Sequence, residues 1–201
     1  MSTRLNLSPD PAFLNLLPVL SGRLARLGEE IHAEEFTELL DPLMCEIIRQ
    51  GVAEAGAHEG TIWLADATGK HLVPAFNTGP RADKIVGQFK QPLNAGLISM
   101  VFASEQPFLE NAVPHNATQS RLLDSLLQVE TTALIAVPFY LLQACRGVIS
   151  CVQLTQPGRA TPGSPEFRRP HLTCMERTAS LLSHLIEHEI LSSIVGWKCR
   201  P

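Results

Sequence analysis

Hydrophobic residues recur at every third or fourth position in two long stretches of the chain. The first runs from Phe36 to Val52, and its spacing predicts an amphipathic helix. Within it, Asp41–Pro42 predicts either a kink or the start of a new helix with proline at its first position. The second stretch, roughly His171–Val195, predicts a long terminal helix. Its apolar stripe consists of Leu172, Met175, Ala179, Leu182, Ile186, Ile190 and Ile194.

Between these two stretches, short apolar runs separated by turn residues predict β-strands. The runs TIWLAD and HLVPAF, joined by ATGK, predict a hairpin. FKQPL and PFLENAV predict two further short strands. Between them, GLISMVFASE predicts a helix with Asn94 as its N-cap. The segment PHNATQSRLLDSLLQ predicts a loop that leads into a short helix.

The least polar part of the chain predicts a second hairpin. Its strands are Ala133–Leu142 and Val148–Leu154, connected through QACRG. Both faces of Ala133–Leu142 are apolar, which is typical of a strand inside a covered sheet. Helices are therefore expected on both sides of this sheet.

Proline and glycine positions divide the chain into three parts. Residues 1–33 are predicted to form an irregular N-terminal extension, because Pro9, Pro11 and Pro18 would interrupt a helix. Residues 34–195 are predicted to form one domain, with a proline- and glycine-rich linker over 155–169 before the last helix. Residues 196–201 form a short tail.

Composition argues against nucleic acid and membranes as partners and favours a cytoplasmic location. The chain has 201 residues, 45% of them hydrophobic and 18% charged, and a net charge of -4. This balance offers no basic stripe for nucleic acid. The apolar runs are too short for a membrane span, and the N-terminus has no signal-peptide core. The five cysteines include no CxxC pair, which favours reduced thiols and a cytoplasmic location.

Three segments in order resemble the GAF domain family, a group of small-molecule sensing and dimerisation modules. They are GTIWLADATGKHLVPAFNTG, PLNAGLISMVFASEQPFLENAV and LIAVPFYLLQACRGVISCVQL. The resemblance implies an α+β fold, with a central antiparallel sheet of about six strands and helices on both faces. It also implies a ligand pocket on one face of the sheet, with terminal helices that cover the other face and often pair between subunits.

Departures from the family patterns exclude some of its ligands. The polar residues that follow the last strand in cyclic-nucleotide-binding members are absent here, where Gln156–Pro157 and His171–Leu172 stand instead. Bilin-binding members need a cysteine in the loop-helix segment, but residues 113–128 contain none. The related reductase for free methionine sulfoxide needs a cysteine just before the fifth strand, and residues 119–132 contain none.

The resemblance places four polar residues near the expected pocket lid, and these are the candidate ligand-binding residues. They are Asn111, His115, Arg121 and Thr132. Arginine is suited to a carboxylate or phosphate, and histidine could donate to an anion or bind iron. Each could equally be a cap or a surface residue. His184 and His188 have the spacing of two helical zinc ligands, but the HExxH motif is absent and a solvated helix face is the simpler interpretation. No metal site or catalytic set is predicted.

The sequence therefore predicts a non-catalytic regulatory domain in signal transduction. It is expected to bind a small effector of unknown identity and to form a homodimer through Met175, Ala179, Leu182, Ile186 and Ile190. An output domain could lie in the same chain or in another.

Two other functions stay open at this point. One is a ligand-free assembly module whose pocket is filled by Phe76, Phe89, Phe102 and Phe108. The other is a thiol reductase that uses Cys145 and Cys151. The simpler interpretation of Cys151 is a small buried hydrophobic residue.

Overall fold

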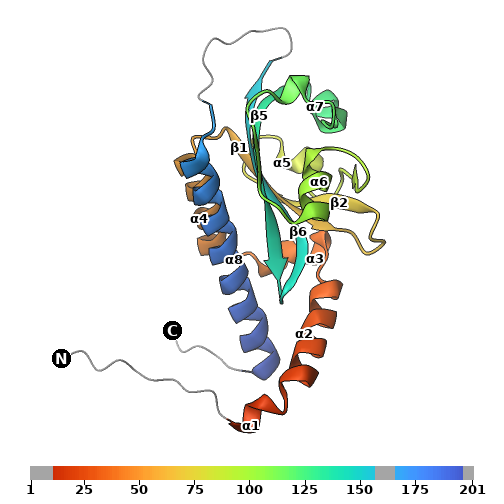
Figure 1. The fold of residues 1–201 in the computed structure, drawn as a ribbon, viewed down its shortest axis with the longest axis vertical. Coiled ribbons are helices and arrows are strands. Elements are labelled where there is room, and N and C mark those ends of the chain that lie inside the picture. The colour runs from red at the N-terminus through yellow and green to blue at the C-terminus, as the bar shows by residue number, and fades with distance from the viewer. Residues whose placement is uncertain (1–10, 157–165, 197–201) are drawn as a thin grey trace, which may run out of the picture.

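The computed structural model describes residues 11–156 and 166–196 and contains a six-stranded antiparallel sheet of order β3-β2-β1-β6-β5-β4 (Figure 1). The strands are β1 (Glu59–Ala65), β2 (His71–Asn77), β3 (Gln91–Pro92), β4 (Phe108–Glu110), β5 (Glu130–Leu141) and β6 (Ala144–Thr155). Both predicted hairpins form, as β1–β2 and β5–β6. The structure thus confirms the α+β class and the expected sheet.

Helices precede the sheet, connect some of its strands and follow it. They are α1 (Pro11–Leu14), α2 (Leu17–Glu30), α3 (Ala33–Leu39), α4 (Pro42–Glu54), α5 (Ala82–Ile85), α6 (Leu97–Ser104), the 3-10 helix η1 (Val113–His115), α7 (Leu122–Leu127) and α8 (Arg169–Val195). None of the helices in the described ranges combines the length and the hydropathy that a membrane crossing needs.

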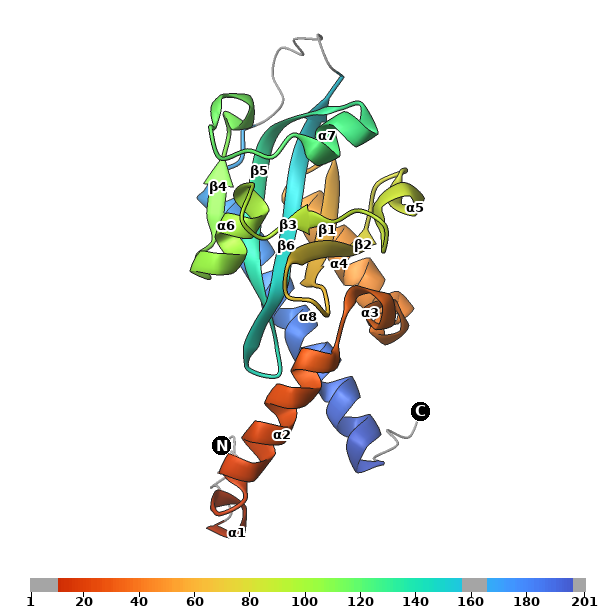
Figure 2. The same cartoon turned by 90° about the vertical axis from the view of Figure 1, so that its right-hand side faces the viewer.

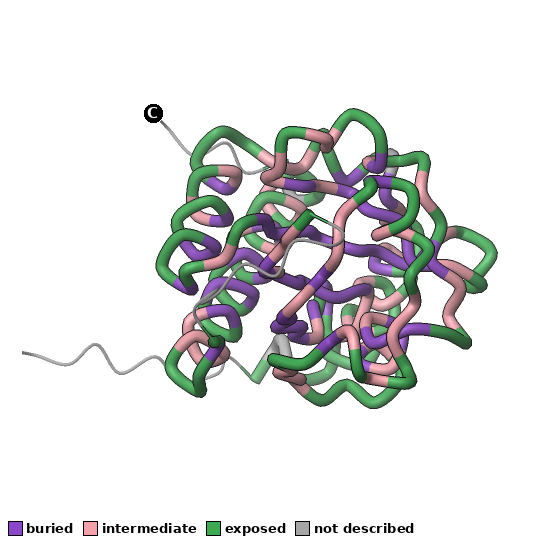
Figure 3. Tube along the Cα trace, turned by 90° about the horizontal axis from the view of Figure 1, so that it is seen from above, coloured by how far each residue is buried: buried purple, intermediate pink, exposed green. Residues whose placement is uncertain are grey.

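The two faces of the sheet carry separate apolar cores. On one face, α3, α4 and α8 pack against Ile62, Leu64 and Ile135. Phe36 from α3 meets Phe139 from β5 edge to face, with ring centroids 6.0 Å apart. On the other face, α6 and η1 pack against the alternate side chains of the same strands. Figure 3 shows the buried residues gathered between these layers and the exposed ones on the outer turns.

Each core uses one set of alternating strand residues. Leu134 and Ala136 of β5 face α6, whereas Ile135 and Val137 face α8. This arrangement explains why the predicted strand is apolar on both faces.

The β5–β6 turn is tighter than the sequence predicts. We expected a connection through QACRG, but the turn consists of Leu142 and Gln143, with φ of 51° and 72°. This shift changes the register, because Cys145 now pairs with Tyr140 and Cys151 with Ile135. A turn through QACRG predicts that Cys151 lies roughly opposite Tyr140, and this prediction is wrong. The turn residues are neither glycine nor asparagine, so the usual signal of such a turn is missing.

Two helix starts resolve alternatives left by the sequence. Asp41 is a true N-cap, since its Oδ1 accepts a hydrogen bond of 2.7 Å from the Met44 amide. The stretch from Phe36 to Val52 is thus two helices rather than one kinked helix. The start of α6 differs from expectation, because Gly96 with φ of 89° occupies the cap position assigned to Asn94.

The N-terminal extension contains more regular structure than its prolines suggest. Residues 17–30 form α2, because Pro18 lies in its first turn, where a missing amide proton costs no helical hydrogen bond. Its C-terminal end contacts the sheet, where Gly28 lies against Leu142 and the Arg146 Nη2 donates to the Glu29 carbonyl over 3.1 Å. Most of the predicted linker and the tail lie outside the described residues.

Candidate functional site

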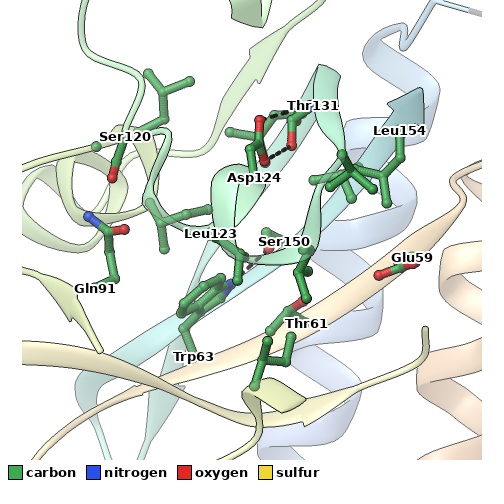
Figure 4. Close-up of a pocket in the computed structure, with 18 of the residues that line it drawn as sticks. Glu59, Thr61, Trp63, Gln91, Ser120, Leu123, Asp124, Thr131, Ser150 and Leu154 are labelled. Carbon is green, nitrogen blue, oxygen red and sulfur yellow. Dashed lines mark hydrogen bonds between the residues drawn. The ribbon is translucent and has the colours of Figure 1, made fainter. Parts of the chain in front are cut away.

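A cavity of about 70 Å³ lies between the sheet and the segments around α6 and α7 (Figure 4). Strands β1 and β6 form its floor through Thr61, Trp63 and Ser150. Leu97 from α6 and Leu123 from α7 contribute to its roof. The cavity therefore occupies the face opposite α8, where the GAF resemblance places a ligand pocket.

The polar groups on the floor are paired with each other. The Trp63 indole Nε1 donates to Ser150 Oγ over 2.9 Å, and the Asn77 amide donates to Thr61 Oγ1 over 2.8 Å. All four residues are buried. Buried hydrogen bonds of this kind hold side chains in one orientation, so the floor is a preorganised surface. An edge-to-face contact between Trp63 and Phe89, with centroids 6.1 Å apart, further fixes the indole ring.

Hydrogen bonds also hold the roof in place. Asp124 in α7 accepts from the Thr131 amide over 2.9 Å and from the Thr131 hydroxyl over 2.7 Å. These bonds join α7 to the beginning of β5 (Figure 4). The guanidinium of Arg81 donates to the Leu127 carbonyl and thereby joins the loop after β2 to the end of α7. The roof is short and is fastened at only a few points.

Glu59, at the beginning of β1, places a carboxylate at the cavity wall. It is one of the residues that line the cavity, and Figure 4 shows it at the edge of this group, on β1. The residue is only 8% exposed. Gly79 makes room for it, since a Cβ atom there would lie 2.7 Å from Glu59 Oε1. Among residues 11–156 and 166–196, no group donates a hydrogen bond to this carboxylate or forms an ion pair with it.

The four residues predicted from the resemblance lie outside this cavity. Asn111 exchanges two hydrogen bonds with the backbone of Phe167, at 2.9 and 2.8 Å, and so anchors the segment before α8. His115 is exposed. Arg121 donates to the Pro114 carbonyl over 3.0 Å at the surface, and Thr132 donates to the Gln153 carbonyl over 3.2 Å. Their chain neighbours Ser120 and Thr131 are the residues that line the cavity.

The predicted pocket-filling phenylalanines do not line the cavity either. Phe89, Phe102 and Phe108 pack into the apolar core around it. Phe76 lies on the opposite face, where the Arg49 guanidinium is 6.0 Å from its ring centroid. These four side chains therefore do not account for the small volume of the cavity.

The residues predicted to form a dimer interface are mostly inside the protein's own core. Met175, Ala179, Leu182 and Ile186 are buried against the sheet, and Ile190 is partly buried beside them. The stripe faces β5, so a dimer contact of α8 must use its other side chains. Leu181, Leu191 and Ile194 are the large apolar residues that α8 exposes.

The cysteines and histidines form no reactive cluster in the described parts of the chain. Burial raises the pKa of Cys145 to about 11 and that of Cys151 to about 12, which keeps both sulfurs protonated at neutral pH. His184 Nδ1 lies 2.6 Å from the Ser180 carbonyl. Within residues 11–156 and 166–196, no three metal-ligating side chains come together.

Several of the residues that sequence reasoning missed come from one face of a strand. Glu59, Thr61 and Trp63 alternate along β1 and share the cavity side. A polar pair on an otherwise apolar, buried strand was a usable signal. Asp124 gave no comparable signal, because its approach to Thr131 depends on how α7 folds over the sheet. Ser150 approaches Trp63 only through the pairing of β1 with β6.

Comparison with solved structures places this architecture among known proteins. The GAF domain of a GAF/HD domain protein from Geobacter sulfurreducens superposes with a TM-score of 0.59 and 14% identity, covering 80% of this chain and 99% of that one. The GAF domain of a phosphoenolpyruvate-protein phosphotransferase from Coxiella burnetii gives 0.54 and 16%, covering 76% and 96%. The chain has a GAF-like fold. No family model matches the sequence, and no curated protein is significantly similar to it.

Enzymes occur among the proteins with this GAF-like architecture. Free methionine-R-sulfoxide reductase from Neisseria meningitidis, in complex with its substrate, superposes with a TM-score of 0.53 and 16% identity, covering 94% of this chain and 99% of that one. At these identities the similarity establishes the fold alone. Function has to be argued from the site.

Proposed function

We propose that this chain is a non-catalytic GAF-type regulatory domain that binds a small effector in the cavity between the sheet and α6–α7. The observation that carries the proposal is the combination of a fixed, hydrogen-bonded floor with a roof held at few points. Trp63 and Ser150 present the floor, whereas Leu123 and Asp124 belong to the short helix above it. A ligand that enters must displace or reposition α7.

The same roof has a direct connection to the terminal helix. Asp124 bonds to Thr131, which belongs to β5, and α8 packs against the opposite face of β5. A shift of α7 would therefore change the strand on which α8 rests. We propose that effector binding alters the packing of α8, and through it the contact with an output domain in this or another chain.

The cysteines favour a binding role over a thiol reductase. No cysteine among the described residues lines the cavity. Cys151 lies on the α8 side of the sheet, in the opposite core. The raised pKa of Cys145 and Cys151 also removes the thiolate that such chemistry requires. Free thiols in the described parts are consistent with the cytoplasmic location that we propose.

Native mass spectrometry with a matched pair of variants tests the binding function. Leu123→Trp fills the cavity from the roof, whereas Leu122→Trp places the same ring on the exposed side of α7, where Leu122 is 54% exposed. We expect a co-purified small-molecule mass in the wild type and in Leu122→Trp, and its loss in Leu123→Trp. An equal bound mass in all three proteins would contradict the proposed site.

The small size of the cavity favours one second candidate, a ligand-free assembly module. Ligand sites usually enclose roughly 300–1,000 Å³, against about 70 Å³ here. In this case the chain would act by binding a partner protein through its terminal helices. Proteins that carry no bound mass, and whose stability does not respond to any metabolite mixture, would support this alternative over the sensor.

A further inference from the structure

Glu59 is a buried carboxylate without a compensating group. The residue is only 8% exposed and lies at the wall of the cavity, yet no donor in the described ranges bonds to its carboxylate. Burial of a charged group is costly unless the charge is paired or hydrogen-bonded. A carboxylate of this kind at a cavity wall provides an acceptor for a ligand that brings its own positive charge or its own donors.

The surroundings of Glu59 do not supply that charge. Among the residues that the structure describes, no lysine, arginine or histidine lines the cavity. Arg81, on the adjacent loop, donates to the Leu127 carbonyl and forms no ion pair with Glu59. The nearby amide donors also have other partners, since Asn77 Nδ2 donates to Thr61 and Gln91 Nε2 donates to the Ala95 carbonyl over 2.7 Å.

Asp124 is the second carboxylate of the lining and, unlike Glu59, it has hydrogen-bond partners. Asp124 accepts two hydrogen bonds from Thr131 and is therefore committed to the roof. It still adds negative charge to a cavity that has no cation. Electrostatics in this cavity disfavour an anion, in contrast to the carboxylate or phosphate that His115 and Arg121 suggested from the sequence. Those two residues lie outside the lining.

Much of the remaining lining is apolar, and the cavity is small. Trp63, Leu97, Leu123 and Leu134 are among its apolar residues. A volume of about 70 Å³ holds roughly five to seven water-sized groups at about 10–15 Å³ each. The closed cavity thus matches a molecule with about five to seven non-hydrogen atoms, and a larger one requires the roof to move.

From this arrangement we propose that the effector is a small aliphatic amine whose ammonium group binds the Glu59 carboxylate. This inference rests on the proposed effector-binding function. The ammonium supplies both the charge and the hydrogen-bond donors that Glu59 lacks. The alkyl part lies against Trp63 and the leucines of the roof, where it replaces water or empty space.

Three probes with the same four-carbon chain and different head groups show whether binding depends on the charge of the ligand or only on its shape. Butylamine, butan-1-ol and butanoate are titrated against the protein, with Trp63 fluorescence as the signal in a Trp197→Phe background. We expect butylamine to bind at least about tenfold more tightly than butan-1-ol, as expected of a hydrogen bond between charged groups. Butanoate should give no saturable change.

Variants at Glu59 test its role directly. In Glu59→Gln the preference for butylamine over butan-1-ol should fall to about onefold, whereas the exposed control Glu38→Gln should keep the wild-type preference. Glu59→Asp retains the charge and should retain a preference for the amine, so a loss in Glu59→Gln cannot be assigned to the side-chain geometry alone. Urea unfolding of each variant verifies that the proteins are folded.

Several results would overturn the inference. They are equal binding of all three probes, tighter binding of butanoate, an unchanged amine preference in Glu59→Gln, and no saturable signal with any probe. The proposed function has a separate readout. If a co-purified mass is lost in Leu123→Trp but retained in Glu59→Gln, the cavity binds an effector that is not held by Glu59, and only the amine assignment fails.

Discussion

At the scale of single residues, Gly51 sets the distance between two helices. A Cβ atom at this position in α4 would lie 2.8 Å from the Thr178 Cγ2 on α8 and closer still to its Oγ1. Thr178 is itself buried. We expect Gly51→Ala to lower the free energy of unfolding by about 1–2 kcal/mol, because overpacking costs more than the helix propensity of alanine returns. Urea unfolding measures the change.

Two further variants test this explanation. Gly22→Ala in α2 meets nothing within 4 Å and should stabilise the protein slightly, since only helix propensity changes there. Thr178→Ala removes the obstructing atoms, so Gly51→Ala should be much less harmful in that background. A full loss of stability in the double variant would show that the contact with Thr178 is not the cause.

The buried thiols give a prediction about pH. The pKa of Cys151 rises from an ordinary value of 9.0 to about 12 on folding, and that of Cys145 to about 11, both because of burial. The folded protein therefore retains protons that the unfolded chain releases, and the resulting stability is present below pH 9 and lost as the pH rises toward 11–12. Cys151→Ala should flatten this alkaline decline in unfolding experiments.

Alkylation provides an independent measurement of the same property. At pH 7.5 we expect Cys145 and Cys151 to react with iodoacetamide far more slowly in the native protein than in urea, because the thiolate is the reactive form. The rate at Cys145 should increase about tenfold per pH unit. Rapid native labelling of either residue at neutral pH would favour the thiol-reductase alternative and contradict the burial argument.

At the scale of elements, the β5–β6 turn is a local source of strain. Gln143 is exposed and has φ of 72°, a conformation that glycine adopts more readily than other residues. We expect Gln143→Gly to stabilise the protein by about 0.5–1 kcal/mol. The same change at Gln50, which is exposed on α4, should destabilise it by a similar amount. Opposite signs in urea unfolding would confirm that the turn conformation decides the effect.

Elements with a clear period could be predicted from the sequence, and this turn could not. The stripe from Met175 to Ile186 identifies α8, and the apolar run around Trp63 with the turn after it identifies β1. The turn at Leu142 carries none of the usual residues, because Leu142 is buried against α2 and its packing outweighs the backbone preference. The GAF resemblance predicted the face that carries the cavity but not its roof residues, since Asp124 reaches Thr131 only after α7 folds over the sheet.

At the scale of the whole molecule, the terminal helices extend beyond the sheet. Figures 1 and 2 show α2 and the C-terminal half of α8 projecting at the same end of the protein. Exposed apolar side chains concentrate there. On α2 and just before it they are Leu14, Leu16, Leu17, Val19 and Leu20, and on α8 they include Leu191 and Ile194. Such a surface is typical of a contact with another chain, and we propose that it forms the dimer.

The dimer prediction can be tested at two positions of equal exposure. Ile194 on α8 and Leu126 on α7 are both 55% exposed, so replacement by glutamate changes a similar surface at each. We expect the wild type and Leu126→Glu to sediment as dimers at tens of micromolar, and Ile194→Glu to sediment as a monomer. Val19→Glu on α2 should act like Ile194→Glu, because both helices would belong to one interface. A monomeric wild type would rule out the dimer, while the cavity and its effector would still be tested by their own experiments.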